Sequence, residues 1–220
     1  RVRGLPVLID ISFIILIVLW GQHYFTSGNT RLMSAGFVIV LGLAASILLH
    51  EFAHAVIGQR FNVRPEYVEL NGLGGACYWA SPMRSEAWPR IAISLAGPAS
   101  NLFLWFLFDQ LGELQTVQSN RMVSHVVTTL ETANWWLFVF NMMPAYPLDG
   151  GKALDALLGK IISNTNAARV VASLGLCLAA YCAYLAVNGN MWMLVLAALL
   201  GLTNWAALQN ANNPPWQRWN

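Results

Sequence analysis

Six long apolar stretches constrain the fold of this 220-residue chain more than any other feature. They lie near residues 7–25, 33–57, 91–110, 124–147, 168–187 and 191–209. Each is long enough to cross a hydrocarbon core about 30 Å thick. Only 10% of the residues are charged, whereas about 25% is usual in a soluble domain. The sequence therefore predicts an all-α polytopic membrane protein with about six transmembrane helices, in one integral-membrane domain covering residues 1–220.

Charge and cysteine content exclude other classes. The net charge is only +2 and no basic arm is present, so a nucleic-acid partner is not expected. The three cysteines form no CxxC pair, which argues against a disulfide framework or a cysteine-based zinc site. The chain begins with Arg1 rather than methionine, so its true N-terminus can lie upstream.

The Lys and Arg residues are divided unequally between the predicted loops. With a cytoplasmic N-terminus, two of them lie outside, Arg31 and Arg121, and ten lie inside. The inside set is Arg1, Arg3, Arg60, Arg64, Arg84, Arg90, Lys152, Lys160, Arg169 and Arg218. By the positive-inside rule both termini are expected in the cytoplasm. The C-terminal half of the second span then lies towards the cytoplasmic side.

The connection after the second span contains a hairpin signal. Asn71-Gly72 lies between two runs rich in apolar and aromatic residues, which predicts a β-hairpin over about residues 66–80. Its apolar character favours a hairpin that dips back towards the membrane and lines a cavity. The alternative is an ordinary cytoplasmic hairpin.

The second span carries the motif His50-Glu51-Phe52-Ala53-His54. A charged group at bilayer depth costs roughly 2.5–3.5 kcal/mol on insertion scales, so these side chains need a reason to be there. On a helix the two histidines lie one turn apart on one face, where they can hold one Zn²⁺. Glu51 lies beside them, where it can accept a proton from attacking water. The alternative, two structural histidines and a stray glutamate, leaves the insertion cost unexplained.

A catalytic zinc site normally needs a third protein ligand. Asp149 is the best candidate among the ten acidic residues, because it follows a break in the fourth span at Pro144 and Pro147. Gly150 and Gly151 then allow a close backbone turn. The alternative is a helix end capped by an aspartate, which is the weaker reading beside H-E-x-x-H.

A run of small residues, from Ala96 to Ser100, interrupts the third span. Small residues let membrane helices approach closely, so this helix can pack against the one that carries the histidines. Asn101 follows and could hydrogen-bond across the interface, although a packing role is the simpler reading.

The chain resembles the site-2 protease family of intramembrane zinc metalloproteases over roughly residues 1–160. The likeness rests on five segments: HEFAH at 50–54, AGPASN at 96–101, NMMPAYPLDGG at 141–151, GLPVLIDISF at 4–13 and GLGGACY at 72–78. It implies a three-helix catalytic core over about residues 32–151, flanked by helices near 7–25, 168–187 and 191–209. It also implies one Zn²⁺ per chain held by His50, His54 and Asp149, with Glu51 as catalytic acid/base and Asn141 near the reacting carbonyl.

The chain departs from the family pattern in two positions and in its domains. Asp10 stands where many bacterial members have histidine, and Lys152 replaces a frequent arginine. The connection between the second and third spans has room for the hairpin but no PDZ domain, and this sequence ends without a CBS domain. Regulation through such domains is therefore in doubt for this fragment.

The resemblance predicts hydrolysis of peptide bonds within or near transmembrane segments of single-span membrane proteins, as in regulated intramembrane proteolysis. The bilayer is the other expected partner, and a prokaryotic inner membrane is the expected location. Gly74 and Gly75 are predicted to contact substrate, because an extended substrate could add to an edge of the hairpin.

Three alternatives remain open. A prenyl-protein protease would take its third ligand from a later glutamate, but no glutamate follows Glu131. A metal transporter or haem-binding bundle would need more ligands along its spans, and only His23 and His125 remain as histidines. A catalytically silent membrane scaffold would be expected to have lost one of the four site residues.

Overall fold

The structure, a computed structural model, describes residues 4–72, 74–80, 86–187 and 189–213. Arg1, Arg3, Arg84 and Arg218 of the predicted inside set, and Leu73 of the predicted hairpin, lie outside these ranges. The chain divides into two compact units. The first comprises Arg1–Gln59, Arg64–Ala80 and Ala96–Val139, and the second Arg60–Val63, Ser81–Leu95 and Phe140–Asn220.

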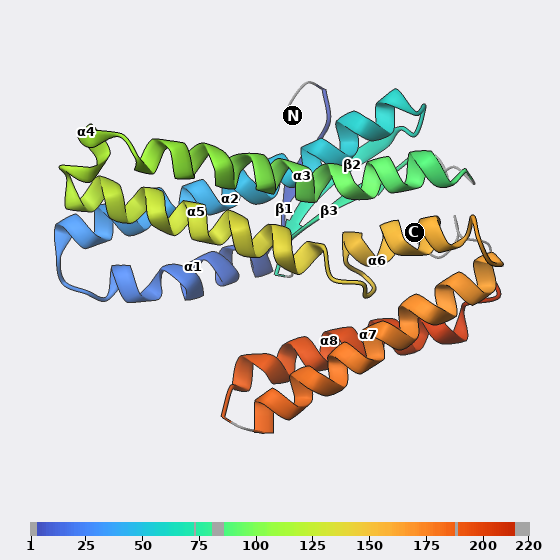
Figure 1. Ribbon diagram of the computed structural model, residues 1–220. Coiled ribbons are helices and arrows are strands. Elements are labelled where there is room, and N and C mark those ends of the chain that lie inside the picture. The colour runs from blue at the N-terminus through green and yellow to red at the C-terminus, as the bar shows by residue number, and fades with distance from the viewer. Residues whose placement is uncertain (1–3, 73, 81–85, 188, 214–220) are drawn as a thin grey trace. The chain divides into compact units, whose positions relative to one another are not determined.

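Long helices dominate the first unit (Figure 1). They are α1 (Ile11–Phe25), α2 (Thr30–Arg60), most of α3 (Ala87–Gly112) and nearly all of α5 (Arg121–Asn141), with the single turn α4 (Gln115–Gln118) between α3 and α5. Ile39 and Leu43 of α2 pack against Leu130 of α5 in a buried apolar cluster. Contacts of this kind hold α2 and α5 together.

Helix α2 buries one face, and the candidate site lies on it. Buried side chains recur every three or four residues through Ile39, Leu43, Ile47, His50 and His54. Because an α-helix has 3.6 residues per turn, these positions form a single stripe. The stripe is apolar in its first half and carries the polar groups in its second half.

A small sheet completes the first unit. Its order is β1 (Val7–Ile9), β2 (Pro65–Asn71) and β3 (Gly74–Trp79), with β1 parallel and β3 antiparallel to β2. The predicted hairpin is confirmed, but the predicted first span is wrong at its N-terminal end. Val7–Ile9 form a strand, and α1 begins only after Asp10, whose side chain accepts a hydrogen bond from the Ser12 amide at 2.8 Å. A continuous apolar run does not itself separate a buried strand from a helix.

The second unit contains α6 (Asp149–Leu158), α7 (Asn164–Val187) and α8 (Met191–Gln209). Helices α7 and α8 run side by side (Figure 1) and share a buried cluster that includes Ala179 and Leu200. The predicted fourth span, 124–147, is wrong at its C-terminal end. Helix α5 stops at Asn141, and the proline-containing segment 142–148 leads into α6, a helix that was not predicted.

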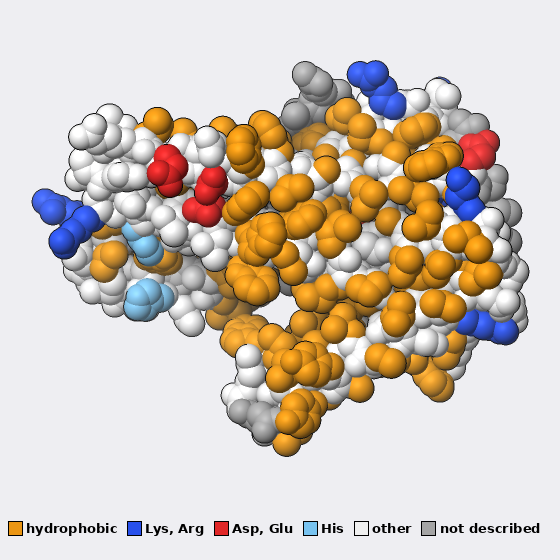
Figure 2. Space-filling model, viewed as in Figure 1, with side chains coloured by type: hydrophobic (Ala, Val, Ile, Leu, Met, Phe, Trp, Pro, Cys, Tyr) orange, Lys and Arg blue, Asp and Glu red, His pale blue; other side chains and the backbone are white. Residues whose placement is uncertain are grey.

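The surface of the described helices suits a lipid environment. Four of them, α2, α3, α7 and α8, are long and apolar enough to cross a membrane, and α1 is a shorter apolar helix. Large apolar side chains cover much of the face seen in Figure 2. For example, Ile15 of α1 is 54% exposed and Leu202 of α8 is 73% exposed. Exposed apolar area of this extent is unfavourable in water. The chain is therefore a multi-pass membrane protein.

Candidate metal centre

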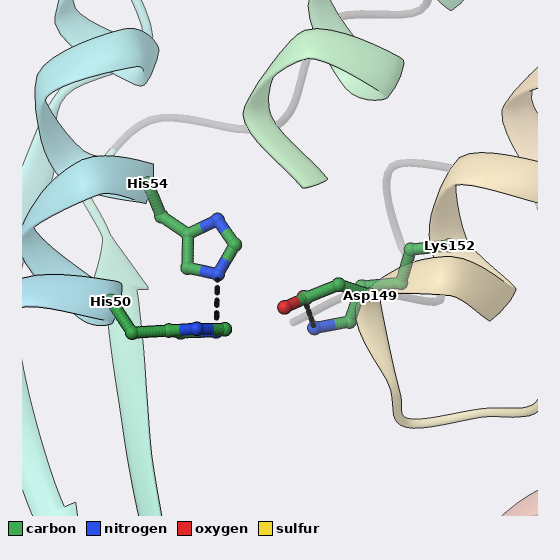
Figure 3. A network of polar contacts seen from close by, with 4 residues as sticks. All are labelled: His50, His54, Asp149 and Lys152. Atoms are coloured by element: carbon green, nitrogen blue, oxygen red, sulfur yellow. Dashed lines mark hydrogen bonds and ion pairs between the residues drawn. The ribbon is translucent and has the colours of Figure 1, made fainter. Parts of the chain in front are cut away.

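His50 and His54 form the centre of the candidate site. Both are buried, and their Nε2 atoms lie 3.1 Å apart with the rings nearly perpendicular (Figure 3). Two histidine ligands of one tetrahedral zinc, each about 2.0–2.1 Å from the metal, would have nitrogens about 3.3 Å apart. The observed spacing thus fits two ligands of a single ion, as the H-E-x-x-H motif predicts.

The other ring nitrogen of His50 has its own partner. Its Nδ1 lies 2.6 Å from Oδ1 of Asn101 on α3, and Asn101 is fully buried. A metal-binding histidine usually donates from its second nitrogen to such an oxygen, which orients the ring. The hydrogen bond considered for Asn101 is therefore present, in addition to its packing.

Gly97 of α3 lies directly against the two imidazoles. A Cβ atom added at this position would collide with Nε2 of both His50 and His54. The small residues of α3 thus let its backbone lie close to the two histidine nitrogens that would bind a metal. A larger residue here would occupy the space next to those atoms.

Glu51 is buried on α2 and lies beside the hairpin. A Cβ at Gly75 of β3 would come within 2.7 Å of Glu51 Cγ and 2.8 Å of its Oε1. The β3 backbone therefore runs against the carboxyl group. Gly74 differs from Gly75, because its φ of +122° lies in a region that favours glycine, and a Cβ there would contact none of the described residues beyond its chain neighbours.

Asp149 and Asn141 belong to the second unit. Asp149 is the first residue of α6 and is 5% exposed, with Lys152 Nζ 3.4 Å from its Oδ1 (Figure 3). Asn141 ends α5 and is half-buried. Lys152, a departure from the family pattern, therefore contacts the predicted ligand itself.

The two glycines after Asp149 have a steric role. A Cβ at Gly150 would collide with the Met142 backbone, and one at Gly151 with the Ala145 backbone. The segment 142–148 therefore folds back tightly over the start of α6. These steric contacts account for the two glycines of the D-G-G sequence.

Helix α8 holds the same segment, a role that the sequence did not indicate. Asn204, fully buried, accepts from the Tyr146 amide at 3.0 Å and donates to the Tyr146 carbonyl at 2.7 Å. Thr203 Oγ1 also donates to that carbonyl, at 3.0 Å. Gly175 of α7 leaves room for the Asn204 side chain. The sequence feature that could have indicated this role is Asn204 itself, an asparagine within an apolar helix.

A buried ion pair is the second feature that the sequence did not reveal. Arg90 of α3 and Asp155 of α6 are both almost fully buried, with Nη2 and Oδ2 2.6 Å apart. The sequence placed Arg90 in the cytoplasmic set and did not indicate a partner for it. The two charges neutralise each other inside the second unit, where an isolated charge would be strongly unfavourable.

Known proteins match both the sequence and the fold. The family model described as peptidase family M50 matches residues 107–182. The zinc metalloprotease MJ0392 of Methanocaldococcus jannaschii is 27% identical over 181 residues, which is 81% of this chain and 50% of the relative. The Rip3 protein of Mycobacterium tuberculosis is 38% identical over 130 residues, which is 58% of this chain and 32% of that protein. The chain thus spans half or less of the length of these two relatives.

A solved structure shares the fold. The site-2 protease from Methanocaldococcus jannaschii matches with a TM-score of 0.65 and 19% identity, covering 94% of this chain and 93% of that one. Apolar helices around a buried pair of histidines define a membrane-embedded helical protein with a candidate metal centre. The chain is similar in sequence to zinc metalloproteases, carries a match to the peptidase family M50 model over residues 107–182, and shares the fold of a site-2 protease. The resemblance seen in the motifs is thereby confirmed.

Proposed function

We propose that this chain is a zinc endopeptidase that hydrolyses peptide bonds within or near the transmembrane segments of other membrane proteins. The observation that carries the proposal is the buried pair His50 and His54, with Glu51 beside them, on a helix apolar enough to span a membrane. The zinc metalloprotease relative supports the same chemistry.

The proposed zinc ligands are His50, His54 and Asp149, with one ion per chain. Two imidazoles and a carboxylate are a common donor set for catalytic zinc, with a fourth position left open. The spacing of the two Nε2 atoms fits this role, and so does the Gly97 position, where a Cβ would fill the space beside them. When bound, zinc supplies Lewis-acid chemistry that acidifies water and polarises a carbonyl.

Glu51 is the proposed general acid/base. Its carboxylate accepts a proton from the attacking water and returns it to the leaving amine. Asn141 is proposed to donate a hydrogen bond to the scissile carbonyl oxygen as charge develops on it. Its position at the end of α5, just before the segment that leads to Asp149, supports this assignment.

The edge of β3 is the proposed substrate site. The Ala80 amide donates to Arg64 O of the neighbouring chain segment, and hydrogen-bonding direction alternates along an antiparallel strand. The main-chain groups of Gly75, Cys77 and Trp79 therefore face away from β2. Since Gly75 lies against Glu51, a substrate strand added at this edge would be brought next to the acid/base.

Prolines on this edge test the substrate site. Cys77→Pro combined with Trp79→Pro removes two outward amide donors, so cleavage is expected to fall at least tenfold while zinc content stays the same. The matched control is Cys77→Ala with Trp79→Ala, which keeps both amides. Equal cleavage by the proline and alanine pairs would show that substrate does not use this edge.

The proposed location is the inner membrane of a prokaryote, with both termini and the active site on the cytoplasmic side. The Lys and Arg distribution in the sequence supports this orientation. Water from the cytoplasm could then reach the site, which hydrolysis requires.

Metal removal tests the function as a whole. The full chain, purified in detergent, is expected to cleave a single-span model substrate, to lose cleavage on treatment with a zinc chelator and to regain it with zinc but not magnesium. Zinc uptake into vesicles without cleavage would favour a transporter. Bound zinc with neither activity, across several single-span substrates, would favour a scaffold.

A further inference from the structure

We propose that a buried relay of hydrogen bonds, Ser46–Asn134–Asn101–His50, fixes the His50 ring in the tautomer that can bind zinc through Nε2. The inference rests on the zinc site proposed above. It makes the side chains of Ser46 and Asn134 positioning groups that act on the His50 ring through Asn101. The four residues come from α2, α3 and α5, all within the first unit.

The relay is anchored at one end by backbone carbonyls, which can only accept hydrogen bonds. Ser46 Oγ donates to Gly42 O at 2.9 Å. Its single proton is thereby used, so Ser46 must accept from Asn134, whose Nδ2 lies 3.1 Å away. The same Nδ2 also donates to Leu130 O at 2.8 Å. Two separate acceptors therefore fix which end of the Asn134 amide is nitrogen.

The orientation of the Asn134 amide determines the orientation of the next groups in the relay. With Nδ2 of Asn134 engaged, its Oδ1 faces Asn101 and accepts from Asn101 Nδ2 at 3.0 Å. Oδ1 of Asn101 then faces His50 Nδ1 at 2.6 Å. An amide oxygen can only accept, so Nδ1 of His50 must carry the proton. In a neutral imidazole the other nitrogen, Nε2, is then unprotonated, as a metal ligand must be.

Burial makes this polarity hard to reverse. Asn101 and Asn134 are fully buried and Ser46 is 2% exposed. If the side-chain amide of Asn101 or Asn134 were flipped, its oxygen and nitrogen would exchange places. Each would then face a neighbouring group of its own kind, an acceptor against an acceptor and a donor against a donor. Because the site lies within packed helices, water is poorly placed to relieve that mismatch. The relay therefore explains why two asparagines and a serine occupy an otherwise apolar helix interface.

Zinc affinity is the first test, measured by chelator competition on the full chain in detergent. Asn134→Leu removes the anchor while filling a similar volume. Because Asn101 is then no longer held with its oxygen towards His50, zinc binding is expected to weaken about 10- to 100-fold, the range typical when the hydrogen bonding behind a metal ligand is disrupted. The control is Ile39→Ala, which removes apolar packing between α2 and α5 but leaves the relay intact. It should lower thermal stability and leave zinc affinity unchanged.

A conservative change at Asn101 separates positioning from packing. In Asn101→Asp, both side-chain oxygens of the ionised carboxylate accept, so the group facing His50 Nδ1 is then an acceptor whatever its orientation. In that background, Asn134→Leu is expected to reduce zinc affinity less than threefold. A purely structural Asn134 would instead cause the same loss in both backgrounds, which would overturn the proposal. Wild-type zinc affinity in Asn134→Leu alone would overturn it too.

The tautomer itself can be read in zinc-free protein from the ¹⁵N shifts of the His50 ring, which distinguish a protonated from an unprotonated ring nitrogen. Protonated Nδ1 in the wild type, and a mixture of tautomers in Asn134→Leu, are expected. Protonated Nε2 in the wild type would refute the relay. This readout needs no zinc, so it still tests the relay if the wild type binds none, which would instead defeat the proposed function.

Discussion

Replacing Glu51 by glutamine is expected to slow peptide-bond cleavage by about 100- to 10,000-fold while the chain keeps its zinc. Glutamine has nearly the same size as glutamate, so it fits the buried space against Gly75. It cannot accept and return a proton in the same way. The measurement pairs the cleavage rate of a single-span substrate with zinc per chain, both on purified protein in detergent.

The matched control for this change is Glu131→Gln. It makes the same substitution on α5, at a half-buried residue outside the proposed site. Its cleavage rate should equal that of the wild type. If Glu51→Gln cleaves as fast as wild type, Glu51 is not the acid/base and the proposed mechanism is wrong. Loss of zinc along with cleavage would point to a structural role for the carboxylate.

Adding one methyl group at Gly97 is expected to weaken zinc binding about 10- to 100-fold. The Cβ of Gly97→Ala would collide with Nε2 of both His50 and His54, so the rings or α3 must shift. Overpacking of this kind costs about 1–3 kcal/mol in a packed interior. Here the displaced atoms are the proposed ligands, so affinity should fall together with stability. Chelator competition measures the effect.

Gly112→Ala provides the control on the same helix. Among the described residues, a Cβ there would meet only Val127 Cγ1, at 3.9 Å, which is an ordinary contact. Zinc affinity and cleavage should remain at wild-type values. Unchanged zinc affinity in Gly97→Ala would mean that the imidazoles do not bind metal on the side that faces α3.

The pattern of apolar residues along the sequence predicted which segments are helical. It predicted less well where the helices begin and end. Each of the six apolar stretches corresponds to a helix. The errors fall at Val7–Ile9, which form a strand, and after Asn141, where α5 ends earlier than its apolar run. Apolar character is shared by strands, helices and buried turns, so it shows that a segment is apolar without fixing its backbone geometry.

The structure gives helices α7 and α8 a role that the sequence did not indicate. The sequence indicated no chemistry in the last two spans. Yet Asn204 of α8, given room by Gly175 of α7, binds both main-chain groups of Tyr146. It thereby holds the segment that leads to Asp149. Likewise, the ion pair between Arg90 and Asp155 joins residues 65 positions apart, and only the fold brings them together.

The sequence by itself determined the membrane class and the residues of the candidate site. An apolar stretch and the i, i+4 spacing of His50 and His54 are properties of consecutive residues, and so is the proline break before Asp149. The tertiary structure decided which groups meet. The contacts of Asn101 with Asn134 and of Asn134 with Ser46 join residues 33 and 88 positions apart. No local periodicity encodes such pairs, because they arise from how α2, α3 and α5 pack.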